Sequence, residues 1–196
     1  MLDRSERSDS GRGLSWVYLD GEAGYEYVGL EAISSSGLTY GDIGPSASGF
    51  VAGAGAGVRL LMFTVGARFR AGMFEDFRLY TVGAEGGLRF PLGSFEPFVT
   101  LGANYAFLGS LSEDTWGGDT SIRGFGANLG AGIDGYLSSI FSIGLRLSGD
   151  ILVLSRTAVT TDPSSTSAQA LAASKAGTGS GVGAAFTSTL VLGLHF

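Results

Sequence analysis

The chain contains no cysteine, a single histidine and only 4 prolines in 196 residues. The absence of cysteine excludes disulfide bonds and thiolate metal sites. Charged residues make up 15% of the sequence, and the net charge of −6 argues against nucleic acid as a partner. No apolar run reaches the roughly 20 residues that a transmembrane helix needs. These absences argue against a disulfide-bonded protein, a nucleic-acid-binding protein and a helical membrane protein.

What is abundant is dispersed apolar residues and glycine. Hydrophobic residues account for 44% of the chain, and there are 34 glycines without the strict three-residue period of collagen. The sequence is too apolar for a disordered protein and poor in charge for a soluble domain. A transmembrane β-barrel has such a composition, because only every second residue of its strands faces lipid.

Eight segments alternate between apolar and polar or small residues, as strands of a membrane barrel do. Each is close to the 9 to 11 residues that a tilted transmembrane strand requires. The segments are 16–28, 49–60, 63–72, 79–90, 96–107, 124–136, 141–151 and a last one that begins near Gly183 and ends at Phe196.

The apolar residues alone decide which positions of each segment face lipid. The positions of the charged residues are therefore an independent test of the alternation. Nearly all charges then fall on the polar face, where a barrel has its lumen, and Arg59 is among them. We predict that they form a network that fills the lumen, with a selective pore or proton path as the alternative. The network residues are Asp20, Glu22, Glu26, Arg68, Arg70, Glu85, Arg89, Asp134, Arg146 and Asp150.

The connections between the segments alternate in length. They are short around Leu60, at 91–94 and at 137–139, and long at about 30–46, 108–121 and 155–181. The second outer connection, near GMFED, is an exception because it is short as well. Short turns at one end and longer loops at the other are typical of outer-membrane barrels. We therefore predict an all-β, eight-stranded antiparallel up-and-down barrel over 14–196, preceded by a disordered polar leader at 1–13. The longest outer loop is expected at 155–181.

The last segment ends on an alternating apolar run, with Leu190, Leu192, Leu194 and Phe196 on one face. Pairing of the last strand with the first would remove both sheet edges, which lipid cannot hydrate. This run resembles the C-terminal signal by which the barrel assembly machinery recognises its substrates.

The segments EPFVTLGANYAF and GFGANLGAGIDGYLSSIFSIGLRL resemble the "outer-membrane protein beta-barrel" superfamily of small OmpA/OmpX-like eight-stranded barrels. The resemblance covers about residues 15–196. It implies an integral protein of a bacterial outer membrane, with both termini in the periplasm. It says little about activity, because the superfamily includes adhesins, anchors and enzymes.

Two surface features carry further hypotheses. Arg78 and Arg123 face outward at the long-loop rim, where they would bind lipopolysaccharide phosphates or simply extend to the membrane interface. Ala52, Ala54 and Ala56 face outward on one strand, where small residues would admit a partner segment or merely face lipid.

Nothing in the sequence predicts catalysis or a cofactor. His195 is the only histidine, and no inward serine and acid are apparent at its depth. The acidic loop residues match no calcium motif, so no metal site is predicted. We expect a structural or anchoring barrel, or an accessory subunit of a larger envelope complex, in contact with outer-membrane lipid and lipopolysaccharide. The alternative is a narrow pore for small solutes or ions.

Overall fold

Alternating side chains and glycine-rich segments produce eight long strands. The computed structural model describes residues 16–29, 46–75, 77–109, 121–157 and 179–196. No helix in this part of the chain is long and apolar enough to span a membrane. The strands are β1 (Val17–Gly29), β2 (Ser46–Leu60), β3 (Phe63–Met73), β4 (Arg78–Arg89), β5 (Phe95–Gly109), β6 (Ser121–Tyr136), β7 (Phe141–Thr157) and β8 (Gly179–His195).

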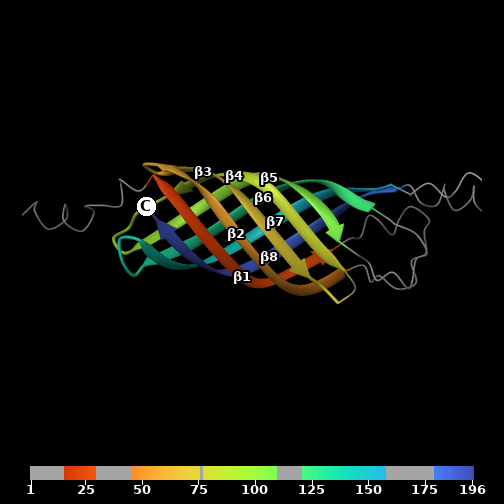
Figure 1. Ribbon diagram of the computed structural model, residues 1–196, viewed down its shortest axis with the longest axis horizontal. Helices are drawn as coiled ribbons and strands as arrows, with labels where there is room; N and C mark the ends of the chain where they lie inside the picture. The colour runs from red at the N-terminus through yellow and green to blue at the C-terminus, as the bar shows by residue number, and fades with distance from the viewer. Residues whose placement is uncertain (1–15, 30–45, 76, 110–120, 158–178) are drawn as a thin grey trace, which may run out of the picture.

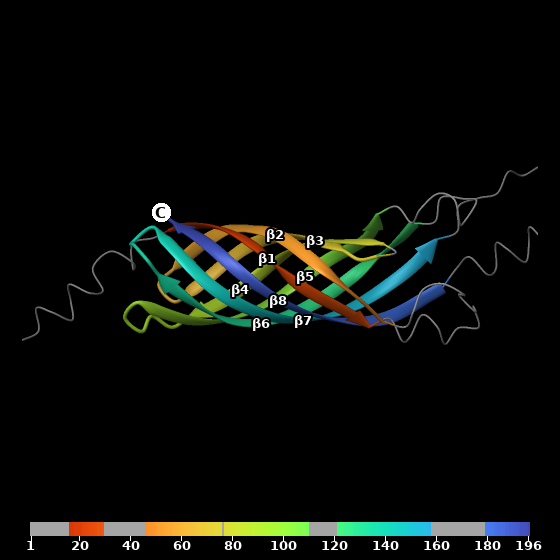
Figure 2. The same cartoon turned by 90° about the horizontal axis from the view of Figure 1, so that it is seen from below.

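The strands form a closed antiparallel barrel in chain order, and β1 pairs with β8. Closure continues to the end of the chain, because the Phe196 amide donates to the Val17 carbonyl at 2.8 Å. The strands cross the long axis of the barrel obliquely, and the C-terminus lies at the end with the short turns (Figures 1 and 2). The predicted fold is confirmed.

Several strands are longer than the sequence pattern predicts. Strand β7 continues to Thr157 and β8 begins at Gly179, so the connection between them is 158–178 rather than 155–181. Both strands have 17 residues, more than the 9 to 11 that a bilayer requires. The predicted leader at 1–13 and this connection lie outside the described residues.

Tight turns join β2 to β3, β4 to β5 and β6 to β7. In the first, Leu61 has a φ of 58°, a left-handed conformation that glycine usually occupies. Nε of Arg59 donates to the Leu61 carbonyl at 2.9 Å. A lumen side chain therefore supports the backbone of this turn.

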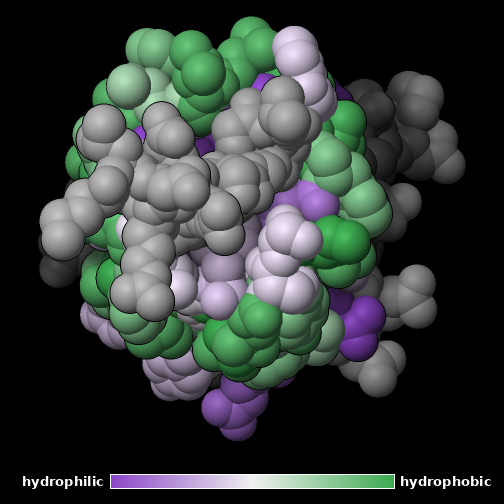
Figure 3. Space-filling view, turned by 90° about the vertical axis from the view of Figure 1, so that its left-hand side faces the viewer, coloured by the Kyte–Doolittle hydropathy of each residue, from purple (hydrophilic) through white to green (hydrophobic). Residues whose placement is uncertain are grey.

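The two faces of the sheet have opposite chemistry. Leucine, valine, isoleucine and phenylalanine side chains are exposed on the outer face, whereas arginine and carboxylate side chains are buried inside. Seen from the short-turn end, green apolar residues gather around the circumference, and pale and purple residues lie toward the middle (Figure 3). Exposed apolar residues and buried charges are the reverse of a soluble domain and suit a lipid environment.

Candidate functional site

The candidate site is the lumen, which contains Arg59 and all ten network residues that the sequence places there. A central cluster consists of Asp20, Glu22, Arg68, Arg70, Glu85, Arg146 and Asp150. A second, short-turn cluster consists of Arg59, Arg89, Glu96, Asp134 and Tyr136. Glu26 is also buried inside, beyond the central cluster, but makes no hydrogen bond or ion pair with another described residue.

Arg68 is the hub of the central cluster. Its Nη1 donates to Oδ1 of Asp20 at 2.8 Å, and its Nη2 donates to Oε1 of Glu85 at 2.8 Å. A second bond to each carboxylate, at 3.0 Å, makes both contacts bidentate. Paired, charge-assisted bonds of this kind fix both distance and orientation. A single guanidinium on β3 therefore connects the neighbouring strand β4 with β1, which lies two strands away on the other side.

Other members of the central cluster meet across the barrel. Arg70 on β3 donates from Nε to Oε1 of Glu22 at 2.7 Å, and its Nη1 lies 3.6 Å from Oδ2 of Asp150 on β7. Strands β3 and β7 are opposite one another in an eight-stranded barrel. Arg146, also on β7, reaches Oε2 of Glu85 at 3.2 Å. Side chains that meet from opposite walls occupy the middle of the lumen.

The short-turn cluster is organised around Glu96, whose side chain is fully buried. Arg59 donates to both of its carboxylate oxygens, at 2.9 and 2.8 Å, and Arg89 donates to Oε1 at 3.0 Å. Nη1 of Arg89 also donates to Oδ2 of Asp134 at 2.6 Å, and the Tyr136 hydroxyl donates to Glu96 at 3.1 Å. Sequence reasoning missed Glu96, although its parity with Phe98 on β5 places it inside.

Phe98 lies between the two clusters. The guanidinium carbon of Arg89 is 4.9 Å from its ring centroid, and that of Arg146 is 5.1 Å away. Both distances are within the range of cation–π attraction. The ring thus fills the lumen between two charged layers and contacts an arginine from each.

The long-loop end of the lumen is apolar, which sequence reasoning did not predict. In the turn between β3 and β4, Phe74 and Phe77 fold inward and stack, with ring centroids 4.6 Å apart. Glycine makes room for them, because a Cβ atom at Gly72 would lie 2.7 Å from the Phe74 ring. This apolar layer consists of Val28, Phe74, Phe77, Leu79, Ala106, Leu152, Leu154 and Ala185.

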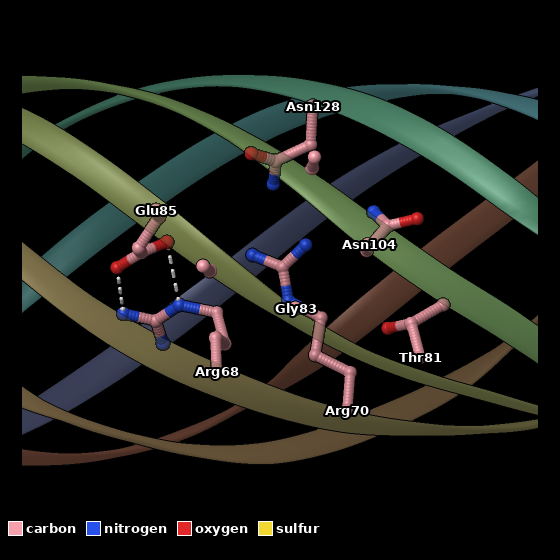
Figure 4. A pocket seen from close by; sticks show the side chains of 9 residues that line it. Arg68, Arg70, Thr81, Gly83, Glu85, Asn104 and Asn128 are labelled. Carbon is pink, nitrogen blue, oxygen red and sulfur yellow. Dashed lines mark hydrogen bonds and ion pairs between the residues drawn. The ribbon is translucent and has the colours of Figure 1, made fainter.

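A small cavity remains beside the central cluster, at the level of Arg70 and Glu85 (Figure 4). Its volume of ≈ 20 Å³ is enough for a water molecule. The Arg70 guanidinium points toward Asn104 and Asn128 (Figure 4), and one polar atom of each of these three side chains lacks a partner within the described residues. Such a site suits a bridging water, with Arg70 as donor and the amide oxygens as acceptors.

His195 has a serine partner that sequence reasoning did not find. Nε2 of His195 lies 2.9 Å from Oγ of Ser142, and its ring is 4.9 Å from that of Tyr136. Ser142 is 1% exposed and His195 is 4% exposed. Nδ1 of His195 has no hydrogen-bond partner in the described part of the chain. An inward serine therefore contacts the histidine, which sequence reasoning missed, but no acid among the described residues orients the ring as a catalytic triad requires.

The remaining predicted residues lie on the outer surface. Arg78 and Arg123 are exposed at the long-loop ends of β4 and β6. Ala52, Ala54 and Ala56 lie on the outward face of β2. Strand β8 pairs with β1 and β7. Its outward side chains are Leu190, Leu192 and Leu194, and the exposed Phe196 follows the strand.

No group of three or more metal-ligating side chains is present among the residues that the structure describes. Except for Glu26, the described lumen carboxylates form ion pairs with lumen arginines. The arrangement is suited to filling and bracing the barrel.

No protein-family model and no curated protein sequence matches the chain. Among solved structures, it is similar to Neisserial surface protein A, with 13% identity, a TM-score of 0.61 and coverage of 92% of this chain and 97% of the other. It is also similar to the outer membrane protein OprG from Pseudomonas aeruginosa, with 13% identity, a TM-score of 0.56 and coverage of 94% and 98%. The chain therefore has the fold of small eight-stranded outer-membrane β-barrels.

Proposed function

We propose that the protein is a closed, non-catalytic barrel of a bacterial outer membrane that serves as an anchor or as an accessory subunit of an envelope complex. Both termini would lie in the periplasm, with the short turns. The barrel assembly machinery would recognise its terminal strand. The outward apolar face and the fold shared with outer-membrane proteins support this location.

The observation that carries the proposal is the filling of the lumen by three successive layers. Ion pairs from opposite strands meet in the middle, Phe98 and the short-turn cluster fill one end, and the apolar layer fills the other. A permeant ion would have to break several charge-assisted bonds and then cross an apolar region. Both steps are costly because charge is strongly destabilised where water is excluded.

The alternative is a narrow pore, which the small cavity favours. It lies beside unpaired polar atoms of Arg70, Asn104 and Asn128, so water would enter part of the lumen. A conducting path would need this wet region to extend through both the ion pairs and the apolar layer.

Planar-bilayer recording of the purified full chain separates the two functions. We expect no stable unit conductance, while a general porin reconstituted in the same way provides the positive control. A reproducible unit conductance from the wild-type chain would replace the closed barrel with the pore.

The non-catalytic part of the proposal rests on burial. Ser142 and His195 form a hydroxyl–imidazole pair in the described lumen, and neither side chain is accessible to a substrate. Hydrolysis of an ester probe by the purified chain, lost in Ser142→Ala, would contradict it.

Partner proteins are tested by native mass after mild detergent extraction from the original membrane. A particle of 20.1 kDa plus lipid and detergent favours an autonomous anchor. A larger particle with defined additional subunits favours the accessory role, and the small residues Ala52, Ala54 and Ala56 are then the first surface to probe. A bulky leucine at Ala54 should release a partner that docks there, because close backbone approach depends on small side chains.

A further inference from the structure

Among the described residues, the charged side chains on the outer surface lie at the long-loop end of the barrel. The outward faces of the described strands carry two charged side chains, Arg78 on β4 and Arg123 on β6. Both are exposed, both lie at the long-loop end, and neither makes an ion pair with another described residue. Glu75, in the turn before β4, is exposed and likewise makes no ion pair with them. Two guanidinium groups that have no carboxylate partner among the described residues, at the rim of a membrane barrel, suit an anionic partner.

The pairing register gives the spacing of the two arginines. Arg123 lies opposite Phe107 on β5, which lies opposite Tyr80 on β4, and Arg78 is two residues from Tyr80 toward the loops. Two strand spacings across and two residues along place the two Cα atoms about 12 Å apart in a flat sheet. Two separate anionic groups on one headgroup fit this spacing.

An aromatic ridge lies next to the two arginines, on the side toward the middle of the barrel. Phe69 stacks on Tyr80 at 6.3 Å between ring centroids, and Tyr80 stacks on Phe107 at 5.3 Å. Tyr105 continues the series, 6.2 Å from Phe107 and 5.2 Å from Phe125. The five rings cross four neighbouring strands, a width of about 14 Å. Such a ridge offers a continuous apolar surface at the depth where acyl chains begin.

A row of alanines follows the ridge, toward the middle of the barrel. The register pairs Ala56 with Ala67, Ala67 with Ala84, Ala84 with Ala103 and Ala103 with Ala127, across five strands. Beyond this row at either end, the same level carries Leu19 and Ile151. Because an alanine side chain ends at Cβ, this row projects less than the ridge beside it, and we call the row the alanine groove.

We propose that this surface, over β3–β6 with Ala56 of β2, binds a lipid of the lipid A class, with two phosphates on a disaccharide and several acyl chains. Arg78 and Arg123 each bind a phosphate by charge-assisted hydrogen bonds, as guanidinium groups do. The acyl chains lie over the aromatic ridge and enter the alanine groove, where close contact adds dispersion energy. A two-chain phospholipid has one phosphate and is narrower than the four-strand ridge.

The assignment rests on the proposed outer-membrane location. Its test uses the purified full chain in detergent and measures lipid binding by native mass spectrometry. The probes are bisphosphorylated lipid A, monophosphorylated lipid A and phosphatidylglycerol.

The variants are Arg78→Gln with Arg123→Gln, and Ala103→Leu, which fills the groove. Ala23→Leu, outward on β1 and outside the surface, is the matched control. Circular dichroism verifies that every variant keeps its strand content.

We expect the wild-type chain to bind bisphosphorylated lipid A most tightly and phosphatidylglycerol least. The double arginine variant should lose about tenfold in affinity for bisphosphorylated lipid A for each arginine removed, because each loses one charge-assisted bond. Ala103→Leu should weaken lipid A binding several-fold, and Ala23→Leu should leave it unchanged.

Equal affinity of the wild-type chain for all three lipids, or lipid A binding unaffected by the double variant, would overturn the proposal. An equal loss of phosphatidylglycerol and lipid A would show a general contact with phosphate, which also overturns it. Loss on Ala23→Leu as large as on Ala103→Leu would refute the groove. Failure here leaves the closed lumen untouched, since conductance and lipid binding are measured separately.

Discussion

At the long-loop end, the lumen is filled by apolar side chains, whereas from its middle to the short-turn end it is filled by ion pairs. The apolar layer is stabilised by the packing of Phe74 and Phe77 against residues of the strands. The hydrophobic effect that drives this packing is not directional. In the charged part, Arg68 and Glu96 each bind several partners at 2.8–3.0 Å. Tightly packed apolar side chains therefore fill one end of the lumen, and directional ion pairs fill the rest. The loss of stability on mutation should differ between the two parts.

Removal of the central hub is expected to have the largest effect. In Arg68→Met, a shorter, unbranched side chain without charge replaces the arginine, and Asp20 and Glu85 lose their bidentate partner. Buried carboxylates without a counter-charge cost about 3–5 kcal/mol of unfolding free energy. Urea unfolding in lipid vesicles measures this loss.

The double variant Arg68→Met with Glu85→Gln serves as the control for this prediction. It should be less destabilised than the sum of its two single variants, because the pair is then removed together. A single Arg68→Met within 1 kcal/mol of the wild type would show that the central cluster is not a unit.

Phe77→Ala tests the apolar part of the comparison. Truncation of a buried aromatic side chain leaves a cavity and costs about 3 kcal/mol. The matched control is Phe186→Ala, on the outward face of β8, which faces lipid and should lose less. Planar-bilayer recording should still show no unit conductance for Phe77→Ala, because the ion pairs below remain. Channel opening in this variant would mean that the apolar layer alone closes the lumen.

The inward orientation of the lumen charges was predictable because alternate residues of a strand point to opposite faces of the sheet. Once apolar residues set the phase, Asp20, Arg68 and Asp150 could only face inward, since a charge facing the middle of the membrane is costly. Glu96 obeys the same rule, and Pro97 between it and Phe98 does not interrupt the alternation. Its inward position follows from the parity of Phe98 and Thr100, continued back to the start of β5.

Turns and register were not predictable in this way. Phe74 and Phe77 belong to no alternating segment, and their inward fold depends on space left by glycines of the neighbouring strands β2 and β3. The contact of Ser142 with His195 depends on how β7 and β8 are offset, which a single sequence does not give. Local patterns therefore predict which face a residue occupies, whereas its partners depend on the three-dimensional arrangement.

Ser142→Ala compares a neutral hydrogen bond with the ion pairs at the same end of the lumen. The variant removes the Ser142 hydroxyl and leaves Nε2 of His195 without that partner. We expect a loss of about 1–2 kcal/mol of unfolding free energy, in the range for one buried neutral hydrogen bond. Ser142→Thr, which keeps the hydroxyl, is the control for urea unfolding. A loss equal to that of Arg68→Met would mean that charge gives the lumen no special stability.

Glu26→Gln is expected to have the smallest effect, and it probes the border between the two parts. Glu26 is buried between the central cluster and the apolar layer, yet it forms no hydrogen bond or ion pair with another described residue. A buried carboxylate without a partner costs free energy, so the neutral amide should leave stability unchanged or raise it by about 1 kcal/mol. Glu22→Gln, which loses the 2.7 Å bond from Arg70, should instead destabilise the barrel. If both variants lost equal stability, Glu26 would belong to the central cluster, and the charged part of the lumen would extend to the apolar layer itself.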